Sequence, residues 1–359
     1  MKKLAKKKWG KKEEKPIITV PDDPKFLPAL QARIAGIHND ISVSIDETNV
    51  ASSIDYFLPS SSFMLDMAMG YGYPSSRIIE IVSEEARGKS FLGLAAIAQA
   101  ELLGGGGLIL DTENKYSPTH GKDLGIHIGD KTIYAQCNTV EQAFDIQEEF
   151  ISTVGQFDKP YVILWDSVAA TGSDSEDQDE DQHTSHPGGI SKILGEQLRR
   201  RIIRKVARKN IYLIYINQLR FSFVKVKWGP PKMVSAAGMA VRYYASVRIK
   251  LDTTDTIPEK SSHPLGVCCT AKVIKNCVSM PFRTAEFNIM FNTGIDDEMS
   301  ILEFLVKQKV VPYSGGWAEY NEKKYRLPDL AELLKNDPGI KQSFTNSCFE
   351  IYNRIDGRL

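Results

Sequence analysis

The stretch that decides the fold reads Ile78-Ile79-Glu80-Ile81-Val82-Ser83-Glu84-Glu85-Ala86-Arg87-Gly88-Lys89-Ser90. Its first five residues are apolar apart from one glutamate, which is typical of a buried β-strand. A polar turn follows, and the apolar pattern after Lys89 predicts a helix that the glycines at 104–107 end. Backbone N–H groups at such a helix N-terminus can hold phosphate oxygens, so this turn is the first candidate site.

The turn has the spacing of a Walker A loop, G-x-x-x-x-G-K-[ST], with Ser83 in place of the first glycine. In this pattern Lys89 reaches the β- and γ-phosphates of ATP and the Ser90 hydroxyl binds Mg²⁺. The strand-turn-helix context strengthens the match, whereas Ser83 weakens it because glycine tolerates turn geometries that serine does not. The predicted nucleotide contacts in this segment are Ser83, Glu84, Glu85, Ala86, Arg87, Gly88, Lys89, Ser90 and Phe91.

Strands alternate with helices on the C-terminal side of this stretch. Apolar runs predict strands at 108–111, 132–135, 161–166 and 211–216, and helical spacing predicts helices at 140–154 and 190–209. This alternation indicates an α/β fold with a mainly parallel, twisted sheet that binds ligands at the carboxyl ends of its strands. Three consecutive strands are then expected between 244 and 291, and helices around a small hairpin from 296 onward.

Three polar residues stand where predicted strands end. Asp166 follows an apolar strand, the Walker B arrangement in which a carboxylate supports Mg²⁺, although an ordinary strand-ending Asp is the alternative. Glu113 follows the strand at 108–111 and could activate water as a general base, or be a surface residue. Gln218 ends the strand at 211–216, where its amide could detect a γ-phosphate.

Two basic segments are candidates for DNA binding. Residues 220–232 alternate aromatic and basic side chains, which suits single-stranded DNA because cations meet phosphates and flat rings stack on bases. An edge strand with core aromatics is the alternative, but Pro230, Pro231 and the lack of a matching partner strand favour a loop. The helix at 190–209 is rich in Arg and Lys and could line a DNA groove or form a solvated face. The acidic loop before it could shield this helix, bind a protein or stay hydrated.

Composition limits the remaining possibilities. The 359 residues suggest two or three domains, and the formal net charge of zero combines +6 on residues 1–15 (eight Lys, two Glu) with −6 on the rest. The body is therefore not a uniformly basic nucleic-acid binder, and the Lys-rich arm is a solvated arm or a nucleic-acid tail. Five cysteines without a CxxC pair or a secretory leader predict reduced thiols and a cytoplasmic protein. No apolar run approaches the roughly 20 residues of a membrane span, so we expect no membrane association.

Taken together, the motifs SEEARGKS, LDTE, VILWDSVAA, IYINQLR, GMAVRYYASVRIKL and KVIKN-x4-PF-x3-EF occur in this order. The sequence resembles the RecA recombinase family over residues 58–335. The resemblance implies a RecA-like P-loop NTPase core at 58–295, a basic disordered arm at 1–20, an N-terminal helical oligomerisation segment at 21–57 and a small α+β C-terminal domain at 296–359.

The resemblance also implies a function and its residues. The protein would be a DNA-dependent ATPase that uses ATP and Mg²⁺, forms a helical filament on single-stranded DNA, pairs it with homologous duplex DNA and exchanges strands, with single-strand-binding or mediator proteins as further partners. The implied catalytic residues are Glu113, Lys89, Gln218 and Lys275, with His120 at the adenine and Ser90 and Asp166 at the metal. The implied DNA contacts are Arg199, Arg220, Phe223, Lys225, Lys227, Trp228, Gly238 and Met239, and the implied subunit contacts are Tyr243 and Lys275.

Several positions depart from the family pattern. Cys277 replaces the second of two lysines that the family places against the γ-phosphate across the subunit boundary, and His120 stands where the family stacks a tyrosine on adenine. Loss of one cation could slow hydrolysis, because catalysis of phosphoryl transfer depends on charge stabilisation. We interpret these departures as those of a divergent member of viral or mobile-element origin. The alternatives to an active recombinase are a structural filament protein that binds ATP and DNA with little hydrolysis, and a regulator that docks on another recombinase.

Overall fold

The computed structural model describes residues 53–173, 189–221, 233–235 and 238–355. The predicted basic arm at 1–20 and most of the N-terminal segment at 21–57 lie outside these residues. So do most of the acidic loop and the centre of the aromatic-basic segment, at 174–188 and 222–232. The predictions made for these segments stay predictions.

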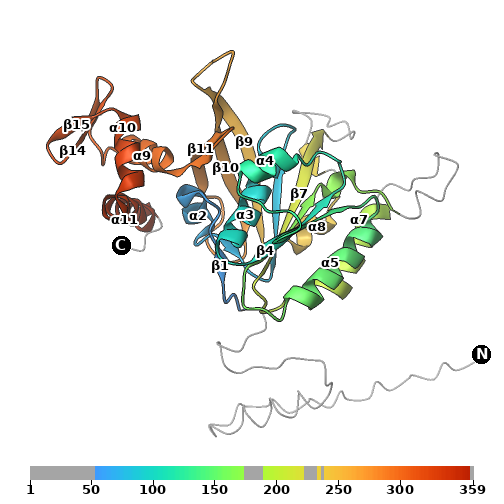
Figure 1. Ribbon diagram of the computed structural model, residues 1–359. Coiled ribbons are helices and arrows are strands. Elements are labelled where there is room, and N and C mark those ends of the chain that lie inside the picture. Colours follow the sequence, from blue (N-terminus) through green and yellow to red (C-terminus); the bar gives the residue numbers. More distant parts are fainter. Residues whose placement is uncertain (1–52, 174–188, 222–232, 236–237, 356–359) are drawn as a thin grey trace, which may run out of the picture. The chain divides into compact units, whose positions relative to one another are not determined.

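One mixed sheet organises the described residues, with ten strands in the order β12-β11-β10-β9-β3-β7-β6-β4-β5 and β8 paired with β7 (Figure 1). The strands from β9 to β5 run parallel, and β9 to β12 pair antiparallel. This architecture confirms the α/β class and the mainly parallel sheet. The strands are β3 (Arg77–Ser83), β4 (Gly106–Asp111), β5 (Thr132–Gln136), β6 (Tyr161–Asp166), β7 (Ile211–Phe221), β8 (Met233–Ser235), β9 (Val247–Ile257), β10 (Gly266–Asn276), β11 (Thr284–Met290) and β12 (Gly294–Asp296).

The parallel strands are apolar on both faces because helices cover both sides of the sheet. Alternate residues of β6 enter different cores: Leu164 packs with the helix after β3, whereas Ile163 and Trp165 pack with the helices on the opposite face. Successive side chains of a strand point to opposite faces of the sheet, and both faces of β6 are buried. The surrounding helices are α3 (Lys89–Leu102), α4 (Pro118–Asp123), α5 (Val140–Val154), α7 (Gly189–Gln197) and α8 (Ala240–Tyr244).

The glycines that follow α3 are required by close packing. A Cβ on Gly105 would lie 1.7 Å from the carbonyl oxygen of Pro160, and a Cβ on Gly106 would lie 2.0 Å from that of Lys131. Only glycine permits these backbones to approach so closely. The chain therefore turns directly from α3 into β4, whose carboxyl end lies beside those of β6 and β5 in the sheet.

The helix predicted at 190–209 is shorter than expected. α7 ends at Gln197, a π-helical turn covers Leu198–Ile202, and the chain then passes through turns to β7. The pattern of buried residues was correct, since Leu194, Leu198 and Ile202 are all in the core.

The prediction that the aromatic-basic segment has no partner strand is wrong for its first two residues, Arg220 and Phe221. β7 continues to Phe221, five residues beyond the predicted end, and pairs antiparallel with β8. Leu219, Arg220 and Phe221 lie opposite Ser235, Val234 and Met233. A three-residue β8 was too short to be recognised from the sequence.

The C-terminal part contains helices around a small sheet, which agrees with the α+β pattern expected there. Buried residues of its helices join the same core as α3, so this part packs on the ATPase-like core. The long helix α11 was missed, because only four of its eighteen residues are buried, Phe344, Thr345, Cys348 and Tyr352, which gives a weak apolar period. The elements here are α9 (Asp297–Lys307), β13 (Tyr313–Ser314), β14 (Trp317–Tyr320), β15 (Lys323–Tyr325), α10 (Leu327–Asn336) and α11 (Pro338–Ile355).

A short helix ahead of β3 was also missed. α2 (Phe63–Met69) begins at Ser62, whose side chain accepts a hydrogen bond from the Leu65 N–H, and packs against β11 and α9. β1 (Phe57–Leu58) and β2 (Tyr73–Pro74) pair beside it. α2 is nearly all buried, so it shows no amphipathic period that the sequence could reveal. None of the helices in the described residues is long and apolar enough to cross a membrane.

Candidate functional site

The turn between β3 and α3 has the backbone of a phosphate-binding loop. Ala86 and Gly88 adopt positive φ angles of 54° and 83°, and Gly88 caps α3. Left-handed residues within such a turn can direct successive backbone N–H groups toward one centre, which is the geometry of an anion-binding loop. Arg87 ties the loop to the sheet, since its guanidinium donates to the Thr253 carbonyl oxygen at 3.3 Å and to Glu84 Oε2 at 3.4 Å.

Lys89 is buried and is bound by its own loop. Its Nζ donates to Ser83 Oγ at 3.0 Å and also contacts the carbonyl oxygens of Ser83 and Glu84. Burial lowers the pKa of Lys89, while the carboxylates of Asp166 and Glu113 act in the opposite direction. The serine that replaces the first glycine of the motif therefore supplies an extra acceptor to the lysine that the motif requires.

Ser90 and Asp166 meet at the carboxyl ends of β3 and β6, as the strand-end pattern predicted. The Ser90 hydroxyl hydrogen-bonds to the Asp166 carboxylate. Burial raises the pKa of Asp166 to about 6, opposed by the Ser90 hydrogen bond and reinforced by the nearby Glu113. Two hard oxygen donors beside a buried lysine fit Mg²⁺ bound together with a phosphate chain. Among the described residues, no group of three or more His, Cys, Asp or Glu side chains could by itself hold a metal ion.

Glu113 lies between three partners from different segments. Its Oε1 accepts from Ser167 Oγ at 2.5 Å and from Gln218 Nε2 at 2.9 Å, and its Oε2 accepts from Lys115 Nζ at 2.5 Å. Burial alone would raise the pKa of Glu113, but the hydrogen bonds from Lys115 and Ser167 hold it below its ordinary value. A carboxylate kept ionised at this position can orient and activate water.

Asp111 positions the loop that carries Glu113. This buried residue accepts from the backbone N–H groups of Glu113 and Tyr116, each at 3.0 Å, and from the Tyr134 hydroxyl at 3.1 Å. Sequence reasoning assigned no role to Asp111, Ser167 or Lys115. The first two are part of the quoted motifs LDTE and WDSVAA, which gave a signal for their location and none for their contacts.

A cavity of about 190 Å³ lies among these side chains and is lined by Ser90, Glu113 and Asp166. The Phe91 and His120 rings, with centroids 6.2 Å apart, form part of its wall at the start of α3 and in α4. Their flat faces could stack on a base, as His120 was expected to do. The predicted residues that line this cavity are Ser90, Phe91, Glu113, His120 and Asp166, together with the unpredicted Asp111, Lys115, Tyr116 and Ser117.

The residues expected at a subunit boundary lie together on the surface. Tyr243 in α8 is 70% exposed, and Lys275 Nζ in β10 donates to the carbonyl oxygens of Tyr243 at 3.0 Å and Arg242 at 3.3 Å. Cys277, which replaces the second lysine, is exposed two residues beyond Lys275. Tyr243, Lys275 and the substituted position Cys277 therefore lie in one region of the protein.

The residues expected to contact DNA are only partly described. Arg199 and Arg220 are exposed, and Met239 is 45% exposed after Gly238, which has a φ of 74°. Phe223, Lys225, Lys227 and Trp228 lie outside the described residues.

The rest of the basic segment at 190–209 is largely neutralised by ion pairs within the protein. Arg201 pairs with Asp145 and Glu148 of α5, and Lys205 also pairs with Glu148. Arg200 pairs with Glu196. These pairs favour the solvated-face interpretation of this segment over a DNA groove.

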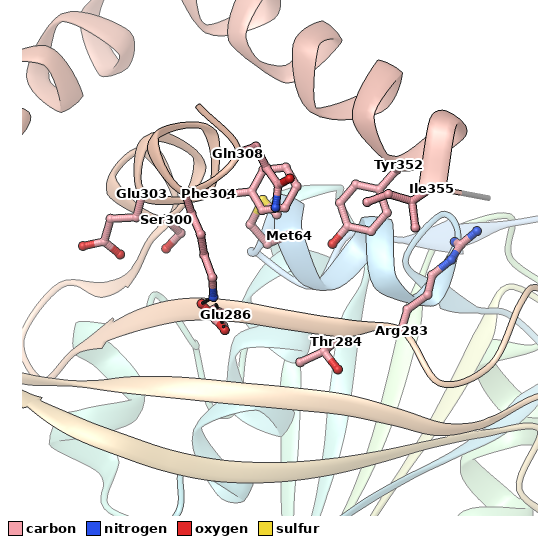
Figure 2. Close-up of a pocket in the computed structure, with 11 residues that line it drawn as sticks. Met64, Arg283, Thr284, Glu286, Ser300, Glu303, Phe304, Gln308, Tyr352 and Ile355 are labelled. Carbon is pink, nitrogen blue, oxygen red and sulfur yellow. Dashed lines mark hydrogen bonds and ion pairs between the residues drawn. The ribbon is translucent and has the colours of Figure 1, made fainter. Parts of the chain in front are cut away.

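A larger cavity, of about 380 Å³, lies away from these residues between β11 and the C-terminal helices. Figure 2 shows Ser300, Glu303 and Phe304 of α9 on one side of it and Tyr352 and Ile355 of α11 on another. The Lys307 ammonium contacts both oxygens of Glu286 at 2.8 Å across its edge. This cavity contains none of the predicted site residues, and its charged groups already have partners: Lys307 pairs with Glu286, Glu303 accepts from Asn288, and Arg283 donates to the Met67 carbonyl oxygen.

The middle of the sheet contains a buried charged network. Arg248 Nε of β9 pairs with Glu80 Oε2 of β3, and Asn217 Nδ2 of β7 donates to Glu80 Oε1 at 2.9 Å. Asn217 Oδ1 in turn accepts from the Gln218 N–H at 2.9 Å. The network thus supports the strand end that presents Gln218 to Glu113.

Comparison with known proteins gives consistent matches. The family model described as the RecA N-terminal domain matches residues 37–296. "Protein RecA" of Treponema denticola is 34% identical over 94% of this chain and 81% of its own length. The proteins of the same name from Laribacter hongkongensis and Rickettsia canadensis are 34% and 36% identical, covering 89% and 82% of this chain and 89% and 84% of their own lengths.

Proposed function

The chain belongs to the RecA family and has the function of a RecA recombinase, and from this we propose that it is a DNA-dependent ATPase that forms a filament on single-stranded DNA and pairs it with homologous duplex DNA. Recombination, DNA repair and the binding of ATP and DNA follow from membership of the family. The observation that carries the finer proposal is the convergence of Ser90, Glu113 and Asp166 at one cavity, with the buried Lys89 near enough to feel both carboxylates.

Each residue of that cavity has a role in the proposal. Lys89 and the N–H groups of the loop at 83–88 would hold the phosphates of ATP, with Phe91 and His120 beside the base. Ser90 and Asp166 would hold Mg²⁺, which neutralises phosphate charge when bound. Glu113 would orient the attacking water and accept its proton, and its ionisation at neutral pH suits a general base.

Gln218 and the surface around Tyr243 would connect the nucleotide to assembly. Gln218 contacts Glu113 directly and lies on the strand that leads into the aromatic-basic segment. Tyr243 and Lys275 would face the next subunit, so that Lys275 completes a neighbour's nucleotide site. Arg199, Arg220, Gly238 and Met239 would contact DNA together with the undescribed Phe223, Lys225, Lys227 and Trp228. The N-terminal segment, the mediator partners, the cytoplasmic location and the viral or mobile-element origin stay predictions.

ATP hydrolysis measured with and without single-stranded DNA tests the proposal. DNA should stimulate the rate, and Lys89→Ala should abolish it because the buried ammonium is lost from the phosphate site. Lys159→Ala is the matched control, since Lys159 is exposed and precedes β6 at the opposite end of the strand. A rate that DNA does not change at saturating ATP and Mg²⁺ would show the enzymatic proposal to be wrong.

A filament protein with little hydrolysis is the second candidate. It is favoured by the exposed Cys277 near Lys275 and by the Ser83 hydroxyl that holds Lys89. On this view Cys277→Lys should raise turnover, because it restores a second cation at the subunit boundary. An unchanged rate in that variant, with filaments still visible by electron microscopy on single-stranded DNA, would count against this candidate. The regulator alternative depends on the acidic loop, which is mostly outside the described residues.

A further inference from the structure

Lys115 is a charged residue of the nucleotide cavity that the sequence analysis did not single out. It lies on the loop between β4 and α4, two residues after Glu113, and its Nζ is 2.5 Å from Glu113 Oε2. The Lys115 side chain is 75% exposed, whereas that of Glu113 is only 12% exposed. An exposed lysine therefore covers the oxygen of a largely buried carboxylate.

Lys115 is a cation among the carboxylates of the nucleotide cavity and its loop. Glu113 raises the pKa of Lys115 most strongly, and Glu85 of the phosphate-binding loop and Asp166 of β6 act in the same direction. Lys89 is close enough that the two ammonium groups oppose each other. Lys115 thus lines the cavity together with Ser90 and Asp166, and the buried Lys89 is a second cation nearby.

The two lysines differ in how firmly they are held. Lys89 is buried and contacts three oxygens of its own loop. Lys115 has one ion-pair partner among the described residues, and most of its side chain is exposed to solvent. Such exposed pairs contribute about 0–1 kcal/mol, and a charge-assisted hydrogen bond to phosphate is a stronger interaction. Exchange of the Glu113 carboxylate for a phosphate oxygen would therefore cost Lys115 little.

We infer that Lys115 is a positioning residue that distinguishes a nucleoside triphosphate from a diphosphate. It pairs with Glu113 when no terminal phosphate is present, and it pairs with the terminal phosphate of a bound triphosphate, which leaves Glu113 free to orient water. This inference rests on the proposed ATPase function and adds to it a contact within one subunit that depends on the γ-phosphate.

Equilibrium binding of a non-hydrolysable ATP analogue and of ADP, each with Mg²⁺, tests the inference. Lys115→Ala should weaken binding of the analogue about tenfold, the size of one charge-assisted hydrogen bond, and change ADP affinity less than twofold. Lys115→Arg should restore most of the preference for the triphosphate because it keeps the cation. Lys122→Ala, which removes an exposed lysine of α4, should leave both affinities unchanged.

Steady-state kinetics give a second measurement on the full-length protein. Lys115→Ala should raise the KM for ATP about tenfold, and Lys115→Arg should restore it. The inference is overturned if Lys115→Ala weakens both nucleotides equally, which indicates a structural role, or weakens neither. A wild-type protein that binds neither nucleotide would refute the proposed ATPase function together with this inference, whereas a DNA-stimulated wild type whose Lys115→Ala variant keeps the same nucleotide preference would refute this inference alone.

Discussion

Replacing Arg248 with methionine is expected to destabilise the sheet strongly. Arg248 and Glu80 form an ion pair in which the two side chains are 9% and 0% exposed. Methionine fills much of the arginine's volume but leaves the Glu80 carboxylate buried without its cation. Asn217 would still donate one hydrogen bond to that carboxylate, which does not compensate for a full charge.

The magnitude follows from burial. Removing one partner of a buried ion pair costs about 3–5 kcal/mol, a large part of the 5–15 kcal/mol by which proteins are usually stable. For a domain of this size the expected decrease in melting temperature is about 10 °C. Urea unfolding followed by circular dichroism would measure the free energy, and differential scanning calorimetry the melting temperature.

The same strand supplies a matched control. Lys250, two residues further along β9, pairs with Asp252 at 3.0 Å, but both side chains are nearly half exposed. Lys250→Met should therefore cost less than about 1 kcal/mol. The double variant Glu80→Gln/Arg248→Met should recover part of the lost stability, because no charge is left buried. The reasoning is refuted if Arg248→Met and Lys250→Met have equal effects.

Three further changes test the site and its support. Ser167→Ala removes the hydrogen bond to Glu113 Oε1 and should lower kcat of the DNA-stimulated ATPase about tenfold with KM for ATP unchanged; a change in KM alone would contradict a role at the base. Asp66→Asn tests the pH dependence of stability: burial raises the pKa of Asp66 to about 7, so the wild type loses stability as pH rises through that value and the variant does not. Between pH 5 and 7, the free energy of unfolding of the variant, measured with urea, should therefore rise relative to that of the wild type by up to about 1.4 kcal/mol per pH unit. Parallel plots of unfolding free energy against pH for the two proteins would disprove the assignment. Tyr134→Phe removes the hydrogen bond to Asp111 and should cost about 1 kcal/mol in the same assay, with no loss indicating that this contact is absent in solution.

Much of the fold could be predicted because the parallel strands are continuous apolar runs. β3, β4 and β6 begin and end within two residues of the predicted bounds, and the segments after them bring Ser90, Glu113 and Asp166 to one cavity. The position of a residue at a strand end was sufficient for that prediction, since parallel strands end at the same edge.

The contacts made by the loops could not be predicted in the same way. Lys115 contacts Glu113 only because Asp111 holds the backbone of that loop, and no periodic pattern encodes such a turn. The pairing of β8 with β7 and the π-helical turn at 198–202 are likewise decided by tertiary packing. Of the residues implied by the family resemblance, those at the nucleotide and the subunit surface have a described geometry, whereas half of the DNA contacts do not.

β7 continues without a break from Gln218, which contacts Glu113, into the residues that pair with β8. The number of residues between these two contacts is therefore fixed by the structure. Gln218 and Phe221 are three residues apart on one extended strand, which at about 3.3 Å per residue fixes their separation near 10 Å. A single inserted residue would turn Arg220 to the opposite side and shift every rung opposite β8. An insertion or deletion in this short span would therefore break the register with β8 that holds Arg220.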